Sequence, residues 1–116
     1  MTKLKEINYT VTGKFLRDVA ERIACNLKVD KIILFGSYAY GKPHPYSDID
    51  LLIIMKSKER ESKRIINVSR LLQNREVPMD FLVKTPSEVK KRLSLGDPFI
   101  RKVLKEGKVL YEKENS

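Results

Sequence analysis

The sequence contains one cysteine, one histidine and no tryptophan. Cys25 has no second cysteine with which to form an internal disulfide bond, and we therefore expect a reducing, cytoplasmic environment. It lies within a helical pattern of apolar residues, which predicts a small residue in the core or at its boundary. A catalytic role for this cysteine is the less favoured interpretation.

Long hydrophobic runs are also missing. No apolar stretch approaches the length that spans a membrane, and residues 1–6 lack the hydrophobic segment of a signal peptide. The sequence has no internal repeat and no low-complexity segment. A length of 116 residues predicts one domain covering residues 1–116, with no membrane association.

Acidic residues are outnumbered by basic ones, 15 to 24, which gives a formal net charge of +9. This balance is compatible with binding nucleotides, nucleic acid or an acidic protein partner. The basic residues are spread along the chain, however, so we interpret the excess mainly as a solvated surface charge. The charged run at 56–64 mixes both signs at helical spacing and has no interleaved aromatic residues, so nucleic-acid binding is not directly expected.

Two apolar segments are the most informative part of the chain. Residues 32–37 (IILFGS) indicate a buried strand that ends in a Gly-Ser turn, and residues 47–54 (SDIDLLII) indicate a strand with two carboxylates near its start. Because side chains alternate along a strand, Asp48 and Asp50 point the same way, repel each other and favour a divalent cation. The backbone N–H groups and hydroxyl of the Gly36-Ser37 turn suit phosphate. The combination predicts metal-assisted chemistry on a nucleotide.

Asp80 is a third acidic candidate. It lies within residues 78–83 (PMDFLV), where a proline at the first position is compatible with a strand. A lone charge inside an apolar strand is costly unless it is paired. If this strand lies beside the second one, Asp80 joins Asp48 and Asp50. The alternatives are a strand-entry cap for Asp48 and a buried salt bridge with a lysine for Asp80.

Apolar spacing and turn residues predict alternating helices and strands, which indicates an α/β protein. Helices are expected at 12–28, at 37–40, after Ser57 as a cap with Glu59 in the first turn, at 86–93, and between the cap Asp97 and Gly107. Strands are expected at 31–36, 48–55, 78–83 and 109–111. Two prolines within residues 42–46 exclude regular structure there.

The order Gly36-Ser37, a spacer of about ten residues, and Asp48-Ile49-Asp50 in an apolar strand resembles the nucleotidyltransferase superfamily. The short chain is similar to the minimal members of bacteria and archaea, and the resemblance covers nearly all of it. It implies the nucleotidyltransferase fold, a small mixed β-sheet flanked by helices. Asp48, Asp50 and Asp80 would be the catalytic residues and the ligands of two Mg²⁺ ions.

The resemblance also implies how ATP is held. Gly36 and Ser37 would contact the triphosphate, and Asp80 would help to deprotonate the attacking hydroxyl. Minimal members often have arginines where this chain has Tyr38 and Tyr40, and Lys42 would supply some of the missing positive charge. The tyrosines could stack on a base, but packing is the favoured interpretation.

His44, in the proline-flanked loop, is either a general base or an incidental loop residue, and the second is favoured.

Minimal nucleotidyltransferases of this kind resemble the antitoxins of toxin–antitoxin pairs whose partner is a HEPN-type ribonuclease toxin. The implied activity is transfer of AMP from ATP to a tyrosine of that toxin. The alternatives are a small-molecule or nucleic-acid acceptor, and a non-catalytic antitoxin that inhibits by contact. The three acids argue against the contact inhibitor, and the lack of room for an acceptor domain argues against a small molecule. Homo- and hetero-oligomers both stay open.

Overall fold

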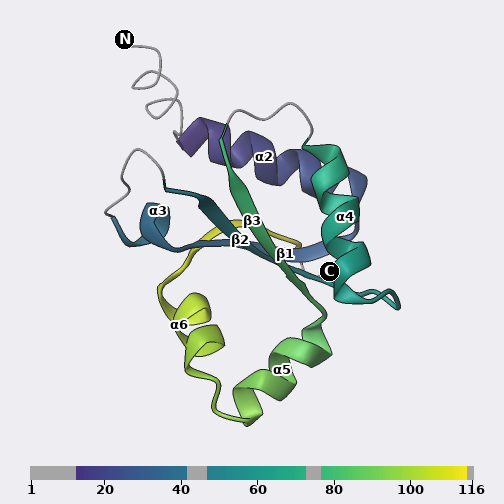
Figure 1. Cartoon of the computed structure of the whole chain (residues 1–116), viewed down its shortest axis with the longest axis vertical. Coiled ribbons are helices and arrows are strands. Elements are labelled where there is room, and N and C mark those ends of the chain that lie inside the picture. Colours follow the sequence, from purple (N-terminus) through teal and green to yellow (C-terminus); the bar gives the residue numbers. More distant parts are fainter. Residues whose placement is uncertain (1–12, 42–46, 73–76, 115–116) are drawn as a thin grey trace.

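A four-stranded mixed sheet forms the centre of the computed structural model, which describes residues 13–41, 47–72 and 77–114 (Figure 1). Its strands are β1 (Val29–Phe35), β2 (Ile49–Met55), β3 (Met79–Lys84) and β4 (Lys108–Glu112), in the spatial order β3-β2-β1-β4. β1 is antiparallel to β2 and β4, whereas β2 and β3 are parallel. The expected small mixed sheet is therefore confirmed. The loop at 42–46, with Lys42 and His44, lies outside the described residues.

Helices cover both faces of this sheet. α2 (Gly13–Asn26) and α4 (Glu61–Leu71) lie on one face, and α5 (Pro86–Ser94) and α6 (Pro98–Glu106) lie on the other, while the short α3 (Ser37–Tyr40) follows β1 (Figure 1). Alternate strand residues enter the two cores. The core under α2 and α4 includes Ile32, Leu34, Leu51, Ile53, Phe81 and Val83. The core under α5 and α6 includes Ile33, Leu52 and Ile54.

The last two helices begin as the sequence predicts. The Asp97 side chain accepts hydrogen bonds from the backbone N–H groups of Phe99 and Ile100, and Gly107 follows the last residue of α6. Thr85 and Glu88 form a capping box at the start of α5, with Pro86 in the first turn. Short polar side chains satisfy free helical N–H groups in this way.

The predicted start of α4 is wrong. The helix begins at Glu61 with Arg60 as its N-cap, and the Ser57 hydroxyl accepts from the Glu59 N–H in the segment before it. The reason is tertiary, because Glu61 accepts a hydrogen bond from the Val83 N–H and so fixes the first turn against β3. Local capping signals cannot report such a contact.

The prediction for Cys25 is also wrong, since its side chain is exposed on α2. The buried residues of this helix are Leu16, Val19, Ala20 and Ile23. Their spacing defines one stripe, and position 25 falls outside it. In the described part of the chain, no helix is both long and apolar enough to cross a bilayer.

Candidate active site

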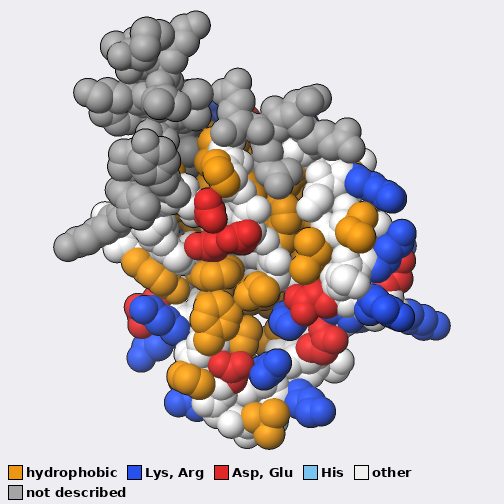
Figure 2. Space-filling model, viewed as in Figure 1, with side chains coloured by type: hydrophobic (Ala, Val, Ile, Leu, Met, Phe, Trp, Pro, Cys, Tyr) orange, Lys and Arg blue, Asp and Glu red, His pale blue; other side chains and the backbone are white. Residues whose placement is uncertain are grey.

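Three side chains from neighbouring strands form a row at one end of the sheet. Asp50 on β2 is in register with Phe35 on β1 and with Asp80 on β3. Residues in register project from the same face, here the face covered by α5 and α6. β3 therefore does lie beside β2, and Asp80 beside Asp50. Figure 2 shows acidic side chains gathered next to a hydrophobic area near the middle of the visible surface.

The negative charge of this row is not neutralised by any cation of the described residues. Burial raises the pKa of Asp50 above its usual value, and the charges of Asp80 and Asp48 raise it further. Between described residues, no ion pair includes any of these three carboxylates. Asp48 and Asp80 are exposed at the surface, so a ligand can reach them. An excess of closely placed carboxylates favours a bound cation.

Gly36 is required by the close approach of Asp50. It has a φ of 77°, in the left-handed region, and a Cβ at this position would overlap Oδ2 of Asp50. The backbone of the turn is thereby held directly against the carboxylate. The turn and Asp50 are therefore direct neighbours.

Ser37 is the first residue of α3, and Gly36 rather than Ser37 is the N-cap, without a side-chain capping bond. The Gly36 carbonyl accepts from the N–H groups of Ala39 and Tyr40. Within the described segments the Ser37 hydroxyl makes no hydrogen bond. It is therefore available to a ligand.

The two tyrosines after the turn lie in different surroundings. Tyr38 packs against the core under α2 and α4, and burial together with the charge of Asp48 raises the pKa of its hydroxyl. Tyr40 is 37% exposed, and the Nζ of Lys102 lies 4.7 Å from its ring centroid. Burial and the charge of Glu106 raise the pKa of Tyr40, while a hydrogen bond with the Gly36 backbone lowers it.

Lys102 is a cation near the turn that the sequence interpretation missed. It lies on α6, far from Gly36 in the sequence, and only the fold brings its Nζ over the Tyr40 ring. In the sequence, the one relevant signal is that Lys102 follows Phe99 by three residues, which places both side chains on the same side of a helix. The predicted contact from Lys42 lies outside the described residues.

The carboxylates fit one particular way of holding a metal. Across residues 13–41, 47–72 and 77–114, no three Asp, Glu, His or Cys side chains are arranged to enclose an ion by themselves. Mg²⁺ in nucleotide sites, however, is held by one or two carboxylates and completed by phosphate oxygens and water. Asp50 and Asp80 in one row, with Asp48 close by, suit that arrangement.

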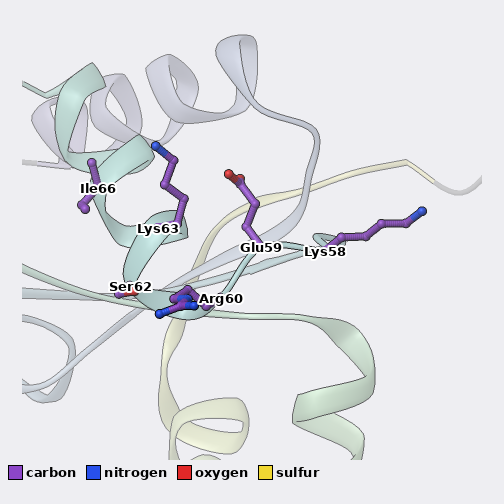
Figure 3. A pocket seen from close by; sticks show the side chains of 6 residues that line it. All are labelled: Lys58, Glu59, Arg60, Ser62, Lys63 and Ile66. Atoms are coloured by element: carbon purple, nitrogen blue, oxygen red, sulfur yellow. The ribbon is translucent and has the colours of Figure 1, made fainter.

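Two hollows formed by described residues lie away from these acids. One shallow depression at the start of α4 is lined by Lys58, Glu59, Arg60, Ser62, Lys63 and Ile66, whose side chains spread apart in Figure 3. A second depression is lined by residues of the β2–α4 segment and the start of α5, including Arg64 and Glu88. Both are at the far ends of β2 and β3 from Asp50 and Asp80. The side chains of the first spread apart (Figure 3), and the Arg64 and Glu88 side chains of the second are already paired with each other.

Comparison with known proteins decides the family. The nucleotidyltransferase domain matches residues 14–111 of this chain. The chain belongs to the nucleotidyltransferase family. Members of this family typically use a nucleoside triphosphate and a metal.

One relative of this nucleotidyltransferase, from Methanocaldococcus jannaschii, is named "Putative protein adenylyltransferase". It is 38% identical over 113 residues, covering 90% of this chain and 72% of the relative. A crystal structure from Sulfolobus solfataricus, described as a "putative nucleotidyltransferase", superposes with a TM-score of 0.65 at 23% identity, covering 97% and 90% of the two chains.

A toxin–antitoxin structure, MntA-HpeT, superposes with a TM-score of 0.56 at 18% identity over 85% of this chain and 74% of the other. At these identities the two structures show the fold alone.

Proposed function

We propose that this nucleotidyltransferase transfers AMP from ATP to a tyrosine hydroxyl of a HEPN-type ribonuclease toxin, and so acts as its antitoxin. The observation that carries the proposal is the register of Asp80 with Asp50. It puts a third carboxylate beside the Asp48–Asp50 pair, without a neutralising cation from the described residues. Such an arrangement suits a metal–nucleotide complex better than a structural ion pair.

Each residue has a role in the proposed reaction. Asp48, Asp50 and Asp80 would hold Mg²⁺, which supplies positive charge at the reacting phosphate and the leaving pyrophosphate. The tyrosine oxygen forms a bond to the α-phosphorus, and the bond from that phosphorus to the bridging oxygen breaks. Asp80 accepts the proton of the tyrosine hydroxyl. Gly36 and Ser37, with Lys42, orient the triphosphate.

The exposure of the acids supports a protein acceptor. Asp48 and Asp80 are exposed at the surface, where a large partner can approach. The name of the Methanocaldococcus relative supports AMP transfer to protein, and the toxin–antitoxin structure with the same fold supports a toxin partner. An added AMP would place a bulky negative charge where the toxin must bind RNA.

Intact mass spectrometry tests the reaction. We would look for a HEPN-type protein in the reading frames beside this gene, mix it with ATP, magnesium and the wild-type chain, and expect the mass of one or more AMP groups on the toxin. Asp48→Asn should abolish the added mass. Asp18→Asn, at an exposed aspartate of α2, is the matched control and should leave transfer unchanged.

Three other results would contradict parts of the proposal. An unmodified but inhibited toxin would indicate inhibition by contact. An unmodified and active toxin would turn the search to small-molecule or nucleic-acid acceptors. Equal magnesium–ATP affinity in the wild type and in a folded Asp48→Asn/Asp50→Asn variant, measured by calorimetry, would refute the metal assignment.

A further inference from the structure

A pair of aromatic rings adjoins the acidic row. Phe35 is in register with Asp50 on the neighbouring strand, and the ring of Phe99 from α6 meets the ring of Phe35 at 85°, with centroids 5.5 Å apart. Phe99 is 46% exposed, although it is a large apolar side chain at the start of a helix. The pair therefore extends the row of Asp80 and Asp50 into an accessible aromatic surface.

We propose that Phe35 and Phe99 form the surface on which the nucleobase of the nucleoside triphosphate stacks. The inference rests on the proposed function, because the phosphate at the acids fixes where the rest of the nucleotide can lie. Neighbouring strands are about 4.8 Å apart, so Phe35 is one strand away from Asp50, and Phe99 lies one ring beyond. In a nucleotide, one ribose separates the base from the α-phosphate. This separation matches the distance from the Asp50 carboxylate to the aromatic rings.

The order of side chains along α6 agrees with the order of the base and the phosphates in a nucleotide. Phe99 lies at Phe35, whereas Lys102, three residues later, holds its Nζ over the Tyr40 ring in α3, directly after the Gly36-Ser37 turn. One helix thus presents an aromatic ring beside the acids and a cation beside the expected triphosphate site.

The chemistry of the surface predicts which feature of the base is recognised. Stacking on aromatic rings uses the π-face that every base has, so it discriminates weakly between bases. We therefore expect ATP and GTP to bind with affinities within a few-fold of each other. Inorganic triphosphate, which lacks a base, should bind much more weakly than ATP.

Calorimetry with two probes, magnesium–ATP and magnesium–triphosphate, separates the base from the phosphates. Phe99→Ala should weaken ATP binding about tenfold and leave triphosphate binding unchanged. Phe99→Tyr, which keeps the aromatic face, should restore ATP binding. Ile66→Ala is the matched control, because Ile66 is also 46% exposed but lies on α4, on the opposite side of the sheet, and its loss should change neither affinity.

The remaining outcomes each decide the inference. If Phe99→Ala binds ATP as tightly as the wild type, the proposed stacking surface is wrong. This holds even if transfer to the toxin falls in that variant, because the aromatic surface would then bind the acceptor rather than the base. Equal affinity of the wild type for ATP and triphosphate overturns the inference as well. A wild type that binds neither probe refutes the proposed function itself. If circular dichroism shows that Phe99→Ala does not fold, Phe99→Leu removes the aromatic face with less loss of volume.

Discussion

The two ends of β3 differ in whether their charged side chains form ion pairs. At its start, Asp80 stands beside Asp50, and these carboxylates have no ion pair among the described residues. At its end, Lys84 pairs with Glu61 at 2.7 Å, and Arg64 pairs with Glu88 at 2.8 Å. Charges that support the fold are paired, whereas those at the start of β3 repel each other. Uncompensated charge of this kind costs stability and is typical of a functional site.

The ion-paired side chains at the end of β3 cover the outer edge of this strand. Arg64 is 5% exposed and donates to the carbonyl oxygens of Val83 and Glu59 as well as to both carboxylate oxygens of Glu88. Glu61 accepts from the Val83 N–H. These bonds occupy backbone groups that an edge strand would otherwise offer to another chain. The second surface depression, which contains Arg64 and Glu88, is therefore part of a structural clamp.

The largest expected effect is on catalysis at the unpaired end. Asp80→Asn should lower the rate of AMP transfer by about 10²–10⁴-fold, because the hydroxyl loses its proton acceptor. Magnesium–ATP affinity should change little, so the loss should appear in kcat rather than KM. Steady-state transfer kinetics, with Asp18→Asn as the control, would check this. Full activity in Asp80→Asn would remove the residue from the mechanism.

The next effect is on stability at the paired end. Glu88→Ala should lower the free energy of unfolding by about 3 kcal/mol, since it leaves the buried Arg64 guanidinium without its carboxylate. It also removes one half of the capping box of α5. Urea denaturation measures the change. Glu112→Ala breaks the exposed pair with Lys31 at 3.6 Å and should cost less than about 1 kcal/mol.

The contrast between the two ends also marks what the sequence can predict. The sequence can propose the acids and the Gly-Ser turn as site residues because they are local patterns on apolar strands, and the sheet brings Asp50 and Asp80 into register. The late start of α4, the burial of Arg64 and the position of Lys102 depend on contacts with distant elements. A charged run alone cannot show that one of its arginines enters the core.

Cys25 was misplaced for a different reason. Two apolar neighbours, Ile23 and Ala24, make its segment resemble a continuous apolar stripe, although the helical period turns position 25 outward. Phe99 was assigned only to a helix, because sequence spacing does not tell that its ring remains exposed beside Phe35.

A smaller effect on stability is expected at low pH. The hydrogen bonds from Arg64 lower the pKa of Glu88 from 4.5 to about 2, helped by the Thr85 backbone and opposed by burial. A lowered pKa in the folded state gives stability that is present above pH 4.5 and is lost as the pH falls toward 2. Because the Glu88 side chain is 44% exposed, we expect this contribution to be about 1–2 kcal/mol. Glu88→Gln should unfold with a weaker pH dependence in this window, and equal slopes would contradict the assignment.

The smallest effect has the opposite sign and comes from the unpaired end. Burial and the charges of Asp80 and Asp48 raise the pKa of Asp50, so its ionised form is less favourable in the folded chain than in the unfolded one. Stability from this group is therefore present below its ordinary pKa and is lost as the pH rises. Asp50→Asn should stabilise the protein at pH 7 by roughly 0.2–1 kcal/mol while it abolishes transfer, because it removes like charges in register. Thermal unfolding at pH 7 and pH 3 measures this, and the gain should vanish at pH 3. A variant that is less stable than the wild type at pH 7 would show that Asp50 holds the sheet together, as Glu88 holds the other end of β3.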